Sequence, residues 1–145
     1  MIAVTAPAGM PAGDVALLRR AEAVLDAAGV PGRHEVATAL RAADGSLHVG
    51  VHVEGSCRRS SVCAEGVALG AARAAGVPLG EVTSVVSVQI KPAGTFRVIA
   101  PCGVCRELIS DYSPAATIWL TEPDTGEVIA VPALDLLPAK SRRVW

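Results

Sequence analysis

Aromatic residues are scarce in this chain of 145 residues, which contains one Phe, one Tyr and two Trp and is only 3% aromatic. The 51% of residues that are hydrophobic are therefore mainly Ala, Val and Leu, and we expect a closely packed core of small aliphatic side chains. The length is typical of a single domain, here residues 1–145 with a flexible N-terminus over about 1–12. Because such a core is thin, we expect association with further copies, which would bury more apolar surface.

Neither sign of charge is in excess, since 13 Lys and Arg stand against 14 Asp and Glu and give a formal net charge of −1. Basic residues gather only in the stretch 140–145, so long-range electrostatics predict no nucleic-acid partner and no membrane partner. No stretch has the length of an apolar transmembrane segment. The N-terminus lacks the basic region and hydrophobic run of a secretory signal, and we expect a cytoplasmic protein.

The pattern of apolar residues predicts helices and strands in alternation. Apolar side chains recur at helical spacing over 14–28, and two alternating segments flank Asp44-Gly45, a turn typical of β-hairpins. The predicted elements are a helix at 14–28, strands at 35–43 and 46–54, a helix at 62–75, a strand at 82–90, a helix at 101–112, strands at 116–120 and 128–131, and a helix at 132–138. This order predicts an α/β fold, a three-layer α/β/α sandwich around a five-stranded sheet.

Four cysteines in a reducing compartment favour a metal or catalytic site over disulfides. Cys102 and Cys105 form a Cys-x-x-Cys pair at the start of one predicted helix, and Cys63 stands at the start of another. Helix N-termini stabilise thiolates, and three thiolates match a catalytic Zn²⁺ site, which leaves its fourth position to water. Cys57 as a fourth ligand would instead close the site and make it structural, although its loop position favours a free thiol or a pocket residue.

Glu65 stands two residues after Cys63 in the same predicted helical turn. Its carboxylate would reach a metal-bound water without ligating the ion and would carry protons from that water to a substrate nitrogen. Taken alone, it would be a first-turn glutamate favoured by the helix dipole, but beside the cysteines we favour proton transfer. Three thiolates leave a Zn²⁺ site with one net negative charge, and Arg106 is the nearest candidate to compensate it.

The stretches Cys63-Ala64-Glu65 and Pro101-Cys102-Gly103-Val104-Cys105 resemble the signature of the zinc-dependent cytidine deaminase superfamily. The use of Cys63 rather than His is similar to the small three-cysteine homotetrameric branch, which includes cytidine deaminases and blasticidin S deaminase. The resemblance implies a cytidine deaminase-like sandwich with a mixed central sheet, a Zn²⁺ cofactor, and a homotetramer with its sites at subunit interfaces.

The resemblance also implies the reaction, which is the hydrolytic deamination of a cytosine nucleoside at its 4-amino group with release of ammonia. Cys63, Cys102 and Cys105 would hold the zinc, and Glu65 would carry the protons. The partner would be a small nucleoside rather than a nucleic acid. A non-enzymatic zinc module for assembly or binding is the alternative, and it would need Cys57 as a fourth ligand and no role for Glu65.

The expected substrate contacts come from the same resemblance. The backbone of Ala64 would lie near the 4-amino group, and Pro101 would border the substrate. In "GVHVEG" Glu54 would contact the ribose, but His52 stands where the family usually has Asn. A histidine differs from Asn in bulk and titration, so this substitution favours a modified nucleoside, whereas Glu54 favours an ordinary one.

Other departures concern charge and substrate. Gly66 stands where many three-cysteine relatives have Arg, and Val104 and Glu107 replace the Arg of blasticidin S deaminase and the usual Gln. The ending "LLPAKSRRVW" resembles the tail of blasticidin S deaminase, which favours an unusual substrate such as that antibiotic. We also predict that Trp145 packs near the pocket of a neighbouring subunit.

Overall fold

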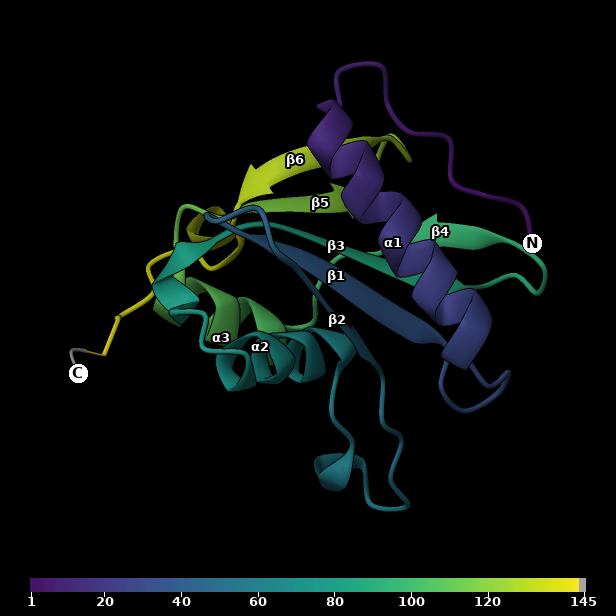
Figure 1. Ribbon diagram of the computed structural model, residues 1–145, viewed down its shortest axis with the longest axis horizontal. Helices are drawn as coiled ribbons and strands as arrows, with labels where there is room; N and C mark the ends of the chain where they lie inside the picture. The colour runs from purple at the N-terminus through teal and green to yellow at the C-terminus, as the bar shows by residue number, and fades with distance from the viewer. Residues whose placement is uncertain (144–145) are drawn as a thin grey trace.

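The computed structural model describes residues 1–143. Figure 1 shows its helices and strands, with three short 3₁₀ helices labelled η in the text. In chain order the elements are α1 (Ala12–Ala28), β1 (Val36–Ala42), β2 (Leu47–Val51), η1 (Arg58–Ser60), α2 (Ala64–Ala74), η2 (Leu79–Glu81), β3 (Val82–Ile90), β4 (Phe96–Val98), α3 (Gly103–Tyr112), β5 (Thr117–Thr121), β6 (Val128–Pro132) and η3 (Ala133–Leu136). The helix predicted at 132–138 is thus the single 3₁₀ turn η3.

The central sheet is mixed and has six strands. Five follow the order β2-β1-β3-β5-β6, and β4 pairs with the far end of β3. The pair β3–β5 is parallel and the other pairs are antiparallel. The α/β class and the mixed sheet are therefore confirmed, but the prediction of five strands is one short. The three residues of β4 are too few to show a strand periodicity.

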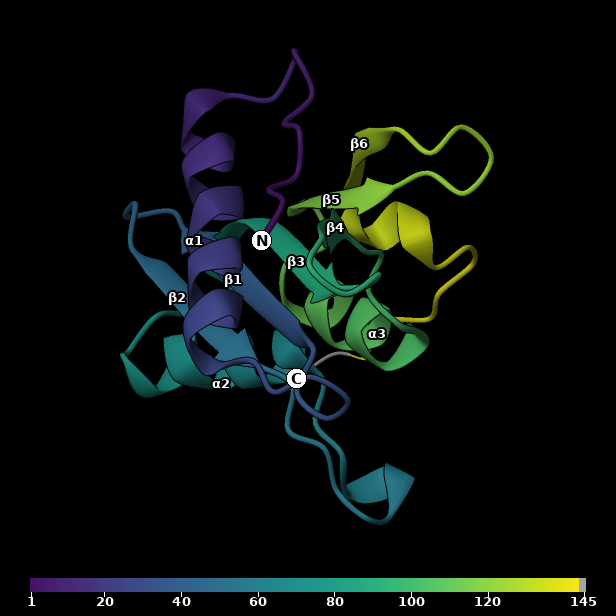
Figure 2. The ribbon, with the colours of Figure 1, turned by 90° about the vertical axis from the view of Figure 1, so that its right-hand side faces the viewer.

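The helices cover both faces of the sheet. Figures 1 and 2 show α1 across one face and α2 with α3 on the other. Each face has its own buried cluster, which includes Leu17, Leu18, Leu25 and Val86 on the α1 side and Ala68, Ala72, Ile109 and Ile118 on the α2 and α3 side. The three layers predicted from the sequence are present, and the cluster under α2 is built largely from small aliphatic residues, as its composition requires.

The first eleven residues run along the sheet before α1 begins. Ile2 exchanges backbone hydrogen bonds with Gly94 at 2.8 Å and Phe96 at 3.0 Å, and the Val4 N–H donates to Glu22 Oε1 at 2.7 Å. The predicted flexibility of residues 1–12 stays a prediction, and Trp145 lies outside the described residues. Within residues 1–143, no helix is both long enough and apolar enough to cross a membrane.

Helix α2 lies directly against the sheet because Gly50 of β2 has no side chain. A Cβ at Gly50 would overlap the backbone nitrogen of Ala68 and would stand 2.6 Å from the carbonyl oxygen of Ala64. Ala64 and Ala68 are fully buried at this contact. The close approach holds the first turn of α2, and with it Cys63 and Glu65, at a fixed height above the sheet.

We predict that Gly50→Ala destabilises the protein by about 1–3 kcal/mol, because the added methyl overpacks a contact with backbone atoms. Gly70→Ala is the matched control on α2 itself, where a Cβ meets no heavy atom within 4 Å. Its helix propensity should raise stability by roughly 0.5–1 kcal/mol. Denaturant unfolding followed by circular dichroism measures both, and a G50A midpoint at or above that of the wild type would contradict the tight contact.

Candidate functional site

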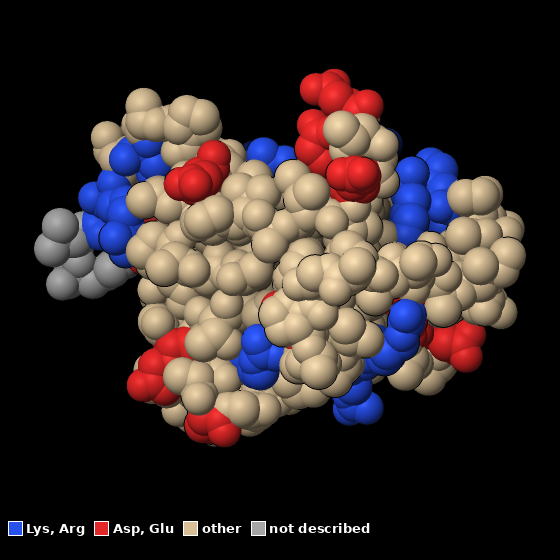
Figure 3. Space-filling model, turned by 90° about the horizontal axis from the view of Figure 1, so that it is seen from above, with Lys and Arg blue, Asp and Glu red and all other residues tan. Residues whose placement is uncertain are grey.

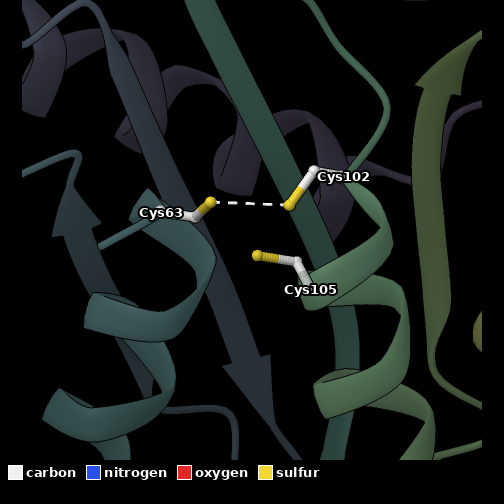
Figure 4. Close-up of side chains that lie close together, drawn as sticks. All are labelled: Cys63, Cys102 and Cys105. Atoms are coloured by element: carbon white, nitrogen blue, oxygen red, sulfur yellow. Dashed lines mark hydrogen bonds between the residues drawn. The ribbon is translucent and has the colours of Figure 1, made fainter. Parts of the chain in front are cut away.

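Three cysteine sulfurs meet where the N-termini of α2 and α3 converge. Cys63 is the residue before α2, Cys102 is the residue before α3, and Cys105 lies in the first turn of α3. Their Sγ atoms all lie within 4.8 Å of one another, with Cys63 Sγ and Cys102 Sγ 3.5 Å apart. Figure 4 shows the three side chains pointing toward a common centre. This arrangement can hold one metal ion, and soft thiolate ligands suit Zn²⁺.

Cys57 does not belong to this group. It is exposed, in the turn that precedes η1. Among the described residues, the cluster able to hold a metal contains Cys63, Cys102 and Cys105 alone. Three protein ligands are the number that catalytic zinc sites use, whereas structural sites have four.

The surroundings of the sulfurs favour a cation among them. Burial raises the pKa of Cys105, which is only 1% exposed, and the nearby charge of Glu65 raises it further. Burial and the contact with Cys102 also raise the pKa of Cys63. Burial acts against ionisation of Cys102 as well, but hydrogen bonds from the backbone N–H groups of Cys105 and Val104 help to lower its pKa overall. Thiolates at Cys63 and Cys105 would therefore be stabilised by a positive partner among the sulfurs.

Glu65 lies next to the cluster and is only 4% exposed. Its Oε2 accepts a hydrogen bond from Cys105 Sγ at 3.5 Å, and its Oε1 accepts one from Ser87 Oγ at 2.9 Å. A glutamate present only to favour the helix dipole would extend into solvent. This carboxylate is instead buried, in contact with Cys105 Sγ.

A small cavity opens beside these groups, with a volume of about 110 Å³. Its lining is Val36, His52, Cys63, Ala64, Glu65, Ile99, Ala100 and Cys102. The structure therefore places His52 and Ala64, two of the predicted substrate contacts, around the same cavity as Glu65 and two members of the cysteine cluster. Pro101 is buried and stands in the chain between two residues of this lining, Ala100 and Cys102.

Glu54 lies outside the cavity lining and is hydrogen-bonded to His52. The His52 Nε2 and Glu54 Oε2 atoms are 3.0 Å apart, and Ser61 Oγ donates to Glu54 Oε1 at 2.6 Å. These hydrogen bonds, first that of Ser61 and then that of His52, lower the pKa of Glu54. Glu54 is therefore linked to the cavity through His52, which lines it.

Arg106 donates its side-chain hydrogen bonds to backbone carbonyl groups. Its Nε donates to the Pro101 carbonyl oxygen at 2.8 Å and its Nη1 to that of Leu136 at 3.4 Å. It braces the loop that carries Cys102 rather than bonding a thiolate. Arg58 and Arg59 instead border a second hollow of about 580 Å³, on the outer side of the cysteines. This hollow also reaches Cys63, Cys105, Gly66 and Val104.

Sequence reasoning missed Ser87 and Thr38, which stand behind Glu65. The two hydroxyl groups are 2.7 Å apart, on directly paired positions of β1 and β3. The available signal was a hydroxyl residue in the middle of each of two otherwise mainly apolar strands. Only the register of the sheet shows that the two belong together.

Comparison with known proteins gives the same picture as the site. No family model matches the chain. A blasticidin-S deaminase from Bacillus cereus is 33% identical over 115 residues, which are 77% of this chain and 79% of that protein. A cytidine deaminase from Halalkalibacterium halodurans is 31% identical over 123 residues, 84% of this chain and 89% of that protein.

Solved structures agree. The crystal structure of cytidine deaminase from Burkholderia pseudomallei matches 90% of this chain and 98% of its own, with a TM-score of 0.72 and 34% identity. That from Mycobacterium leprae matches 89% and 99%, with a TM-score of 0.69 and 27% identity. With this sequence identity, this shared fold and the three-cysteine cluster, the chain belongs to the cytidine deaminase family, as its two cysteine motifs predicted.

Proposed function

We propose that this protein is a zinc-dependent aminohydrolase that removes the 4-amino group of a cytosine nucleoside, such as cytidine or deoxycytidine, and releases ammonia. One observation carries the proposal, namely the buried Glu65 carboxylate in contact with Cys105 of a three-cysteine cluster. Relatives of this chain are named cytidine deaminase and blasticidin-S deaminase. Cys63, Cys102 and Cys105 would hold the ion.

Each residue of the site then has a task. Zinc, when bound, supplies a Lewis acid that makes water a nucleophile at neutral pH. Glu65 takes a first proton from the attacking water at Oε2, the oxygen on the side of the sulfurs, and gives it to the ring nitrogen. It then takes the second proton, from the hydroxyl group newly bonded to C4, and gives it to the departing amine, so that ammonia leaves and a carbonyl remains. The backbone of Ala64 borders the cavity at the place of the 4-amino group, and Pro101 shapes the adjoining wall.

His52 and Glu54 would bind the sugar of the nucleoside. Because the cavity of about 110 Å³ is smaller than the roughly 300–1,000 Å³ of most ligand pockets, it fits only the reacting end of the base. The rest of the nucleoside lies toward His52 and the Glu54 carboxylate hydrogen-bonded to it. Glu54, held ionised by its partners, accepts hydrogen bonds from sugar hydroxyls, and His52 orients it.

A modified cytosine nucleoside such as blasticidin S is the second candidate substrate. It is supported by the identity of 33% to a blasticidin-S deaminase and by the imidazole at position 52. With such a substrate the protein would serve antibiotic resistance, and with cytidine it would serve pyrimidine salvage. The structural zinc module is disfavoured because Cys57 is exposed and stands outside the cluster.

We further propose that the protein works as a homotetramer in the cytoplasm, on a small molecule and without a nucleic-acid partner. Val104, at the start of α3, is 74% exposed beside the hollow of about 580 Å³. Burial of such apolar surface by further copies would favour assembly. On the face in Figure 3, acidic and basic side chains lie in small separate groups on a mostly uncharged surface, and the formal net charge of the chain is −1.

Zinc content tests the ligand set. We expect about one Zn²⁺ per wild-type chain and loss of most of it in Cys63→Ala, Cys102→Ala and Cys105→Ala, because each change leaves only two protein ligands. Cys57→Ala is the matched control and should keep its zinc. Metal analysis of purified protein by mass spectrometry gives the counts. Loss of zinc from C57A equal to that from C63A would instead support a closed structural site with Cys57 as its fourth ligand.

Glu65→Gln tests the proton shuttle, because the amide keeps the shape of the side chain but cannot accept the proton. We expect ammonia release to fall by about 10²–10⁴-fold while zinc content stays unchanged. Glu81→Gln, at an exposed glutamate of η2, is the control and should keep wild-type turnover. Unchanged turnover in E65Q would remove Glu65 from the mechanism.

A substrate panel tests the reaction itself. Ammonia release is measured with cytidine, deoxycytidine, cytosine, blasticidin S, adenosine and guanine, and we expect it from cytosine nucleosides only. His52→Asn should shift the ratio of kcat/KM toward cytidine over blasticidin S by about fivefold, the worth of roughly one hydrogen bond. Release from adenosine or guanine alone, or from none of the six, would contradict the proposed function.

A further inference from the structure

Two hydroxyl groups lie on the inner face of the sheet, directly beneath the first turn of α2. Thr38 of β1 is 0% exposed and Ser87 of β3 is 3% exposed. They pair across the two strands, and neither belongs to the cysteine cluster nor lines the cavity. Because a hydroxyl is costly to bury without hydrogen bonds, two of them at a single cross-strand pair call for a common partner.

Glu65 is the partner of Ser87, and Thr38 reaches it only through Ser87. The donors and acceptors of the three groups set the direction of their hydrogen bonds. Ser87 Oγ donates its one hydrogen to Glu65 Oε1 at 2.9 Å. Ser87 Oγ can then only accept within the Thr38 pair, so Thr38 Oγ1 donates to it at 2.7 Å. The result is a directed chain from Thr38 through Ser87 to one oxygen of Glu65, and hydrogen bonds in such chains strengthen one another.

The two carboxylate oxygens are therefore unequal. Oε1 is held from below by Ser87, while Oε2 faces the cysteine cluster at 3.5 Å from Cys105 Sγ. We propose that Ser87, supported by Thr38, is a positioning residue that fixes the Glu65 carboxylate and leaves Oε2 as the oxygen that exchanges protons with water and substrate. This inference rests on the proposed function and adds to it how the shuttle is aimed.

The reason for such a brace is the freedom of the side chain. A glutamate has three rotatable side-chain bonds, and proton transfer requires its oxygen within hydrogen-bond reach of the reacting atoms. Without the Ser87 hydroxyl, Oε1 would be buried with no donor on the sheet side, and the carboxylate would turn to find one. A displacement of about 1 Å at a reacting group can reduce the rate by 10²-fold.

The test compares Ser87→Ala with Ser84→Ala. Ser84 lies on the same strand β3 and is 1% exposed, and its Oγ has no hydrogen-bond partner among the described residues. We expect S87A to lower kcat by about 10–100-fold with KM within about twofold of wild type and with unchanged zinc content. S84A should keep the wild-type kcat. Wild-type kcat in S87A, or equal losses in the two variants, would overturn the proposal.

A double-mutant cycle separates positioning from general damage. If Ser87 acts only through Glu65, then adding S87A to E65Q changes the residual rate by less than about twofold. A further loss as large as in the wild-type background would show an effect outside Glu65 and overturn the proposal. Thr38→Val, which keeps the shape of Thr38 but cannot donate, should lower kcat by about threefold, and an unchanged rate would remove Thr38 from the chain.

A crystal structure of zinc-loaded S87A gives a readout that needs no substrate. We expect the Glu65 carboxylate to leave its place or to occupy more than one rotamer, while the cysteines keep theirs. A carboxylate in the wild-type position would overturn the positioning role even in an active enzyme. If the wild type deaminates none of the nucleosides, the proposed function fails, and this structure still decides whether Ser87 holds Glu65.

Discussion

The close contact between α2 and the sheet is the constraint on which the site depends. Gly50 contributes no side chain there, and fully buried alanines of α2 complete the contact. A helix at this distance cannot slide or tilt freely, because its backbone atoms already meet those of β2. The scarcity of aromatic residues is consistent with this contact, since bulky side chains would lift α2 and move Glu65 away from Ser87, its partner on β3.

Electrostatics complete what packing begins. Two helix N-termini bring their partial positive charges to the same point, where Cys105 and Glu65 are buried, Cys63 is half-buried and Cys102 is exposed. A cation among these groups would stabilise their negative charges. The guanidinium expected to help, that of Arg106, binds carbonyl oxygens instead. Arg58 and Arg59 line the hollow that also reaches Cys63 and Cys105.

The sequence was sufficient where structure is local. Periodicity located α1, and the hairpin signal at Asp44-Gly45 located the turn between β1 and β2. The cysteine motifs identified the cluster because each occupies one helix start. The strand β4 was not predictable, since three residues carry no period. The contact between Thr38 and Ser87 was also hidden, because the two lie 49 positions apart and meet only through sheet register.

The cysteine cluster also has a mechanical consequence. Cys63 and Cys102 are separated by 39 positions and stand at the starts of the two helices of one layer, so an ion held by both would act as a staple between α2 and α3. Such an ion would close a long loop of chain and would bind the folded state alone, so its binding free energy would add to the stability of that layer. The concentration of metal in the surroundings would then enter the folding equilibrium as well as catalysis.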